Sequence, residues 1–235
     1  MSAALRVGGL TPLTSLDYPD HLACVVFTQG CPLRCGYCHN PHLLDRQSAA
    51  EAPSWNQVLD FLQRRQQLLE AVVFSGGEPT QQAALVDAVA QVRALGFQVA
   101  LHTAGLYPQR LSTLLPHLSW VGLDIKATPE RYPIICGRPR VAAQVVNSLE
   151  QLLIWERPFE VRLTLHPKDY TLAQVGDLLD WLSRYPIPHL VLQIARGGSC
   201  LRPEYQQIIT PFSTAELNQL IKDSAHHWPR LSLRT

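Results

Sequence analysis

The stretch LACVVFTQGCPLRCGYCHNP, residues 22–41, joins an apolar run to a loop rich in cysteine. Residues 22–28 are mostly aliphatic, aromatic or β-branched, which is typical of a buried strand. Glycines and prolines interrupt the residues that follow and predict an irregular loop. The stretch therefore predicts a strand whose carboxyl end leads directly into a loop carrying Cys31, Cys35 and Cys38.

Working outward from this strand, short apolar runs alternate with segments of helical periodicity. The predicted strands are residues 22–28, 71–75, 97–101, 119–125, 159–166 and 189–195, and the predicted helices are residues 54–69, 80–95, 108–118, 141–155, 171–185 and 213–226. Ser54 and Gln57 have the spacing of a capping box, and Gly96 is suited to a left-handed helix end. The alternation favours parallel strands with helical crossovers. A doubly wound open sheet and a partial barrel both satisfy it.

Composition limits the class of protein. The 235 residues are 46% hydrophobic and 17% charged, which favours one folded domain spanning residues 1–235. The net charge of +1 gives no long-range positive field for nucleic acid. No segment has the length and apolarity of a signal peptide core or a membrane span. We therefore expect a soluble, cytoplasmic protein with neither a nucleic acid nor a membrane as partner.

The spacing of the cysteines predicts a metal centre. Cys31, Cys35 and Cys38 lie within eight positions, and soft thiolates suit iron-sulfur or zinc centres. Three thiolates would leave one iron of a 4Fe-4S cluster open to a substrate or cofactor. A zinc site with His39 as the fourth ligand is the alternative, although its adjacency to Cys38 makes tetrahedral chelation awkward. The remaining cysteines, Cys24, Cys136 and Cys200, show no metal-binding spacing.

A second motif, Gly76-Gly77-Glu78-Pro79, follows the predicted strand at residues 71–75. Two glycines allow the backbone to approach a ligand closely, and Glu78 places a carboxylate where α/β folds build their sites. A plain turn between strand and helix is the alternative interpretation of the glycines.

Together the two motifs resemble those of radical S-adenosylmethionine (SAM) enzymes. Nearly the whole chain also resembles the activating proteins of anaerobic ribonucleoside-triphosphate reductase, which belong to the glycyl-radical-enzyme activases. The segments that carry this resemblance are TPLTSLDYP (11–19), FTQGC (27–31), VFSGGEPT (73–80) and GLDIK (122–126). The resemblance implies a partial (β/α)6 barrel of the TIM type, with a 4Fe-4S cluster and SAM as cofactors.

The resemblance also implies site residues. It assigns the cluster to Cys31, Cys35 and Cys38, and the SAM amino group to Gly76, Gly77 and Glu78. Further SAM-binding candidates are Tyr37 in the cysteine motif, Asp124 and Lys126 at the end of the fourth predicted strand, and Arg162 on the polar face of the fifth. Lys126 as a solvated strand end and Arg162 in a structural ion pair remain alternatives.

One position departs from the related activases. Residues 101–105 read LHTAG, where those activases tend to carry Asp-Thr-Asn-Gly. His102 therefore replaces a carboxylate that would help to bind a monovalent cation, and we expect no such cation site. We expect His102 instead to hydrogen-bond SAM or Asp124, with a titration near the ordinary histidine pKa of about 6.5.

The resemblance implies reductive cleavage of SAM to methionine and a 5′-deoxyadenosyl radical. That radical would take a hydrogen atom from a backbone glycine of a partner, foremost an anaerobic ribonucleotide reductase. A one-electron donor such as flavodoxin or ferredoxin would supply the electron. The alternatives are another glycyl-radical activase, a small-molecule enzyme similar to 7-carboxy-7-deazaguanine synthase, and a non-catalytic iron-sulfur or zinc protein.

Overall fold

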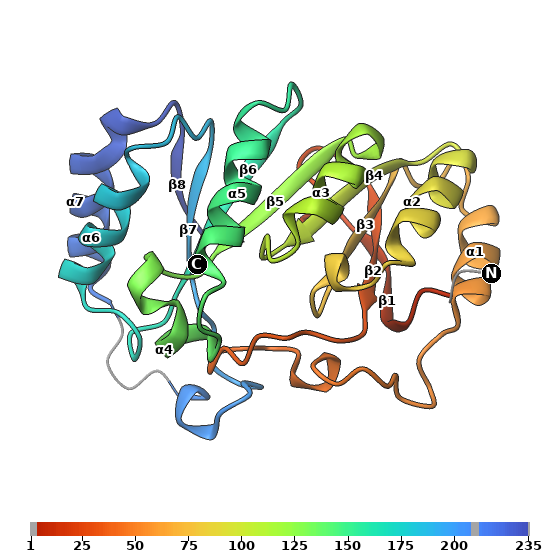
Figure 1. The fold of residues 1–235 in the computed structure, drawn as a ribbon, viewed down its shortest axis with the longest axis horizontal. Coiled ribbons are helices and arrows are strands. Elements are labelled where there is room, and N and C mark those ends of the chain that lie inside the picture. Colours follow the sequence, from red (N-terminus) through yellow and green to blue (C-terminus); the bar gives the residue numbers. More distant parts are fainter. Residues whose placement is uncertain (1–3, 208–211, 235) are drawn as a thin grey trace.

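The computed structural model describes residues 4–207 and 212–234 of the chain. Its strands form one sheet in the order β1 to β8 (Figure 1). The strands are β1 (Val7–Thr14), β2 (Ala23–Thr28), β3 (Ala71–Gly76), β4 (Gln98–Thr103), β5 (Trp120–Ile125), β6 (Phe159–Leu165), β7 (Leu190–Ile194) and β8 (Leu231–Arg234). β1 is antiparallel to β2, and every later neighbouring pair is parallel.

Helices connect the parallel strands. They are α1 (Trp55–Gln63), α2 (Leu85–Ala94), α3 (Pro108–Leu114), α4 (Tyr132–Cys136), α5 (Ala142–Leu153), α6 (Leu172–Leu182) and α7 (Thr214–Ser224). Short 3-10 turns lie at Pro41–Leu43, Pro79–Gln81, Leu115–His117, Pro129–Arg131, Pro203–Tyr205 and Ala225–His227. The predicted capping box at Ser54 and Gln57 is present, and Gly96 after α2 has a φ of 92°. No helix among residues 4–207 and 212–234 is long and apolar enough to cross a membrane.

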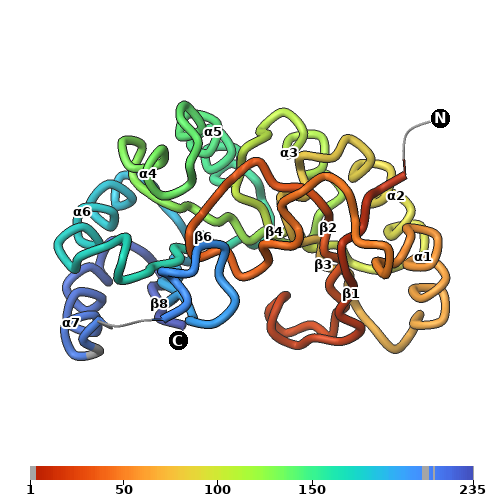
Figure 2. Tube along the Cα trace, turned by 90° about the horizontal axis from the view of Figure 1, so that it is seen from below, coloured from red at the N-terminus to blue at the C-terminus, as the bar shows by residue number. Residues whose placement is uncertain are grey.

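The strand order decides between the two architectures left open by the sequence. A doubly wound sheet reverses its order at a switch point, whereas here the order runs from β1 to β8 without reversal. The two edge strands do not pair, so the sheet curves into an open, partial barrel (Figure 2). The predicted partial barrel is confirmed, and its six predicted strands correspond to β2 to β7.

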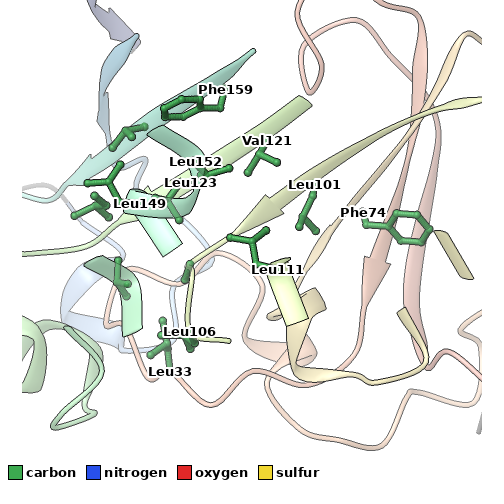
Figure 3. Packing of buried hydrophobic residues seen from close by; sticks show 14 of the residues in the cluster. Leu33, Phe74, Leu101, Leu106, Leu111, Val121, Leu123, Leu149, Leu152 and Phe159 are labelled. Atoms are coloured by element: carbon green, nitrogen blue, oxygen red, sulfur yellow. The ribbon is translucent and has the colours of Figure 1, made fainter. Parts of the chain in front are cut away.

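Alternate strand residues divide the sheet into two faces. One face packs against the helices through side chains such as Phe74, Leu101 and Leu123, and Leu111 of α3 and Leu149 of α5 meet them there (Figure 3). All five are essentially inaccessible to solvent. This packing gives the sheet a stable support, since each buried leucine or phenylalanine contributes about 1.5 to 3 kcal/mol.

The other, inner face carries a second, smaller buried cluster and a loop. Val25, Val73 and Ala100 form a second buried cluster with Tyr18, which lies in the segment between β1 and β2. The Tyr18 ring lies 5.8 Å from the ring of Trp120, and its hydroxyl donates to Gln98 Oε1 at 3.0 Å. The segment between β1 and β2 therefore fills part of the interior of the barrel.

Several elements differ from the sequence prediction. β1, β8 and α4 were not expected, β4 continues to Thr103, and α1 ends at Gln63 rather than at residue 69. After α1 the chain turns through Gln67, whose φ is 67°, and this left-handed residue prevents the helix from continuing. The extension of β4 matters most, because it brings His102 and Thr103 into the sheet.

Candidate active site

The cysteine loop crosses the carboxyl ends of the parallel strands. Figure 2 views the molecule from this side, and Figure 1 shows the segment after β2 running beneath the strands toward α4. Its start is fixed by backbone hydrogen bonds, from Gly30 N to Leu43 O at 2.8 Å and from Cys31 N to Leu44 O at 3.1 Å. Arg34 N donates to the carbonyl of Cys136 in α4 at 2.8 Å. The loop is thus held on both sides of the opening that the carboxyl ends of the parallel strands surround.

A segment after β7 holds the middle of this loop. Leu201 N donates to Cys38 O at 2.9 Å, and Arg202 N donates to Gly36 O at 3.2 Å. The Tyr205 ring lies directly over Gly36, where the Cβ of any other residue would overlap it. Gly36 is therefore required by the Tyr205 ring, which adds a packing reason to the presence of glycine in the cysteine motif.

The three thiols have different environments. Burial, followed by the negative charge of Glu78, raises the pKa of Cys31 to about 12. Burial also raises the pKa of Cys38. The pKa of Cys35 is lowered instead, foremost by the interaction of its sulfur with the neighbouring Cys136 thiol. Cys35 is consequently the thiol of the three that most readily becomes a thiolate.

The Gly76-Gly77-Glu78 motif is joined to the cysteine loop through the backbone. Gly77 N donates to Thr28 O and Glu78 N donates to Gly30 O, both at 2.9 Å. Gly76 has a φ of 112°, and a Cβ on Gly76 or Gly77 would overlap the backbone of Thr28 or Gly30. The two glycines are thus needed for the close approach of two chain segments.

The Glu78 carboxylate is 1% exposed and accepts four hydrogen bonds from the protein. Oε1 accepts from Thr80 N at 3.0 Å, Thr80 Oγ1 at 2.5 Å and Thr103 Oγ1 at 2.7 Å. Oε2 accepts from Ala104 N alone, at 2.7 Å. Burial raises the pKa of Glu78, and the hydrogen bonds oppose this shift. Each carboxylate oxygen has two lone pairs, so Oε2, which accepts one hydrogen bond, retains one acceptor position.

A second charged group lies on the inner ends of β5 and β6. Arg162 Nε donates to Asp124 Oδ1 at 2.7 Å, and Lys126 Nζ lies 3.3 Å from Asp124 Oδ2. Burial raises the pKa of Asp124, but the charges of Arg162 and Lys126 outweigh this effect and lower the pKa to about 2. Asp124 in turn raises the pKa of Lys126 against the opposing effect of burial. The group therefore holds two cations and one anion.

His102 points to the inner face beside Ser75 and Asp17. Its Nδ1 lies 3.3 Å from Ser75 Oγ, and its Nε2 lies 2.8 Å from the carbonyl oxygen of Asp17. This carbonyl can only accept, so Nε2 carries the proton and donates to it. Burial, followed by the charge of Arg162, lowers the pKa of His102 to about 3. The expected titration near pH 6.5 is therefore wrong, because the buried imidazole stays neutral there.

Residues 25–187 match the family model of the Radical SAM superfamily. The chain belongs to the radical SAM superfamily. Enzymes of this superfamily bind a 4Fe-4S cluster and SAM, and this radical SAM enzyme has three thiols on one loop at the mouth of the sheet. Soft thiols suit an iron-sulfur cluster. Within residues 4–207 and 212–234, no three Cys, His, Asp or Glu side chains converge on a position for a single metal ion.

Two curated relatives of this radical SAM protein bear names of activating enzymes. One relative is a protein of Methanocaldococcus jannaschii whose name describes a glycyl-radical enzyme activating enzyme. It is 31% identical over 130 residues, which cover 54% of this chain and 52% of that protein. The pyruvate formate-lyase-activating enzyme of Clostridium pasteurianum is 32% identical over 139 residues, covering 57% and 58%. Each match spans little more than half of the relative.

Solved structures agree on the fold. SuiB of Streptococcus suis bound to S-adenosylmethionine has a TM-score of 0.65 and 13% identity, covering 87% of this chain and 48% of SuiB. Native anSMEcpe with bound AdoMet has a TM-score of 0.64 and 17% identity, covering 88% of this chain and 62% of that protein. At these identities the likeness concerns the fold alone.

Sequence reasoning missed the residues that support the motifs of this radical SAM protein. Thr80 and Thr103 donate to Glu78, Cys136 lowers the pKa of Cys35, and Tyr205 covers Gly36. The alternation of side chains along β4 could have indicated Thr103, whose side chain faces the Gly76-Gly77-Glu78 motif. Cys136 and Tyr205 offered none, since their contacts are distant in the sequence.

Proposed function

We propose that this radical SAM protein activates a glycyl radical enzyme, specifically an anaerobic ribonucleotide reductase. The observation that carries the proposal is the position of the three-cysteine loop over the mouth of a sheet with unpaired edge strands. Because β1 and β8 are unpaired, a polypeptide loop would be able to approach the inner face from the side, which a closed ring would deny. The activating enzymes among the relatives support the same class of reaction.

In this proposal Cys31, Cys35 and Cys38 hold the 4Fe-4S cluster through their sulfurs. When bound and reduced, the cluster supplies the electron that cleaves SAM into methionine and a 5′-deoxyadenosyl radical. The neighbouring Cys136 thiol favours the thiolate form of Cys35, which is the form that binds iron. Tyr37, which is 5% exposed, packs in the main core and anchors the last turn of the loop.

Glu78 would receive the amino group of SAM. Its Oε2 retains one acceptor position beside the bond from Ala104, and a buried carboxylate attracts an ammonium group. Gly76 and Gly77 bring the backbone of this turn against the start of the cysteine loop. The amino-group site and the cluster ligands would therefore stand at a fixed separation.

The charges on β5 and β6 would face the carboxylate of SAM. Arg162 and Lys126 both pair with Asp124, which leaves one net positive charge at the end of these strands. A carboxylate would compensate this charge by Coulomb attraction. Lys126 thereby provides the cationic charge that a bound monovalent cation would otherwise supply. Both ring nitrogens of His102 are engaged by protein groups. His102 would therefore act indirectly, by holding Ser75 and the carbonyl of Asp17 in place.

The test uses anaerobically reconstituted protein with dithionite and SAM. Release of 5′-deoxyadenosine, together with a glycyl radical detected by electron paramagnetic resonance on an anaerobic ribonucleotide reductase, is the expected result. Pyruvate formate-lyase serves as the second partner, and a radical only there would overturn the reductase assignment. Cys31→Ala, Cys35→Ala and Cys38→Ala should each abolish the absorption near ~400 nm and SAM cleavage, whereas Cys24→Ala should not. A cluster retained in any of the three variants would contradict the ligand assignment.

We further assign residues 1–235 to one radical SAM domain and place the protein in the cytoplasm. The first assignment is supported by one continuous sheet from β1 to β8. The second is supported by six free cysteines, which a reducing compartment would maintain. A stable fragment from limited proteolysis that keeps the cluster would contradict the single domain.

A further inference from the structure

Beside Cys31, on the cysteine loop, lies a hollow of about 410 Å³. Its lining includes Cys31, Arg34, Arg46, Gln81 and Arg138. Neither Glu78 nor the charged group at Asp124 takes part in the lining. The hollow therefore approaches one of the assigned cluster ligands without using the residues assigned to SAM.

The rim of this hollow is strongly basic for this chain. Three exposed arginines and one aspartate, Asp45, line it, whereas the whole chain has a net charge of only +1. None of the three arginines forms an ion pair with a carboxylate among the described residues. The three arginines outnumber the one aspartate, so positive charge is concentrated along this rim.

Two of the guanidinium groups are held in place by the loop itself. Arg34 Nη1 donates to the carbonyls of Cys31 and Leu33 at 2.7 and 2.8 Å, and Arg138 Nε donates to Pro32 O at 3.0 Å. A guanidinium has five N–H donors, so donors remain on both for a partner. The fixed positions lower the entropic cost of binding an acidic surface at this place.

We propose that this arginine-rimmed hollow is the docking surface for a small, acidic one-electron carrier protein. The inference rests on the proposed function, in which an electron has to reach the cluster from outside. The carrier would lose one electron, the cluster would gain one, and no atom or proton would be exchanged between them. Charge complementarity favours an acidic carrier, and the hollow is large enough to receive a side chain or the edge of a cofactor from it.

The first test measures binding of a purified flavodoxin, and separately of a ferredoxin, to the cluster-loaded protein by anaerobic calorimetry. Arg46→Glu is the main variant, because Arg46 does not share in the loop hydrogen bonds of Arg34 and Arg138. We expect the Kd of the carrier to rise about tenfold at low salt, and the difference to shrink at high salt. Arg184→Glu, on an exposed residue between α6 and β7, is the matched control and should change the Kd less than about twofold.

The second test uses dithionite, which needs no docking surface. SAM cleavage driven by dithionite should be equal in the wild-type protein, Arg46→Glu and Arg184→Glu. Loss of this cleavage in the wild-type protein would be a failure of the proposed function and not of the docking surface. Carrier binding that is absent in the wild-type protein or unaffected by Arg46→Glu would overturn the docking proposal. A dithionite-driven glycyl radical yield that falls in Arg46→Glu would also overturn it, since the hollow would then serve the glycyl radical enzyme.

Discussion

Glu78 Oε2 accepts a 2.7 Å hydrogen bond from the backbone N–H of Ala104, and this bond ties the turn after β3 to the end of β4. With the three bonds to Oε1, the carboxylate joins two neighbouring strand ends beneath the cysteine loop. Glu78 therefore has a structural task that does not depend on any ligand.

The first prediction follows from these bonds. Glu78→Gln replaces one acceptor oxygen by an amide NH2, which leaves at least one buried donor unpaired. We expect the free energy of unfolding to fall by about 1 to 3 kcal/mol, and SAM binding to weaken by about 1.5 to 3 kcal/mol. Urea unfolding and SAM titration measure the two effects. Glu150→Gln, on an exposed residue of α5, should change stability by less than about 0.5 kcal/mol. Wild-type stability in Glu78→Gln would contradict the structural task.

The second prediction concerns the neutral imidazole of His102. Its pKa is about 3 in the folded protein, against an ordinary value of 6.5, so the unfolded chain binds one more proton between these values. Stability from this residue is complete above pH 6.5 and is lost progressively as the pH falls toward 3. His102→Gln should remove this dependence. The slope of the unfolding free energy against pH should then fall by about 1 kcal/mol per pH unit below pH ~6. Urea unfolding of the cluster-free proteins at several pH values measures it; identical slopes would show that His102 titrates normally.

The third prediction concerns Lys126 and monovalent cations. Because Lys126 already neutralises Asp124, SAM cleavage by the wild-type protein should be nearly equal in potassium, sodium or tetramethylammonium at constant ionic strength. Lys126→Gln leaves the Asp124 Oδ2 without its cation, and this variant should be activated by potassium. Strong potassium activation of the wild-type protein would mean that a cation site exists despite Lys126.

The fourth prediction tests the contact between Gly36 and Tyr205. Gly36→Ala places a methyl group where the Tyr205 ring lies, so the cysteine loop has to move. We expect this variant to retain less than about half of the cluster after reconstitution, measured as bound iron and as absorption near ~400 nm. The double variant Gly36→Ala with Tyr205→Ala removes the overlap and should recover cluster content. A double variant as poor as Gly36→Ala would show that the methyl group acts elsewhere.

The sequence predicted the strands that are buried on both faces. Runs such as residues 22–27 and 120–123 are continuous and apolar, which is the pattern that such burial requires. β1 was not predicted, because Gly8, Gly9 and Pro12 interrupt its apolar character. β8 was not predicted, because it has only four residues and all of them are half-buried. α4 contains Pro133 and spans five residues, too few for a helical period to show.

The candidate site was only partly predictable for a different reason. Cysteine spacing and the two glycines are local patterns, and they identified the loop and the turn. The partners of His102 are a hydroxyl on β3 and a backbone carbonyl before β2. Every residue has a backbone carbonyl, so the sequence does not indicate which one accepts this hydrogen bond. The low pKa of His102 arises from burial by these distant segments, so the histidine itself gave no indication of it.

The attachment of Tyr205 over Gly36 sets an order of events during biosynthesis. Cys31, Cys35 and Cys38 leave the ribosome early, while the segment that holds their loop follows only after β7 has been synthesised. Until then the three thiols lie on a loop that lacks this clamp. If these cysteines hold the proposed cluster, its final environment is complete only late in translation.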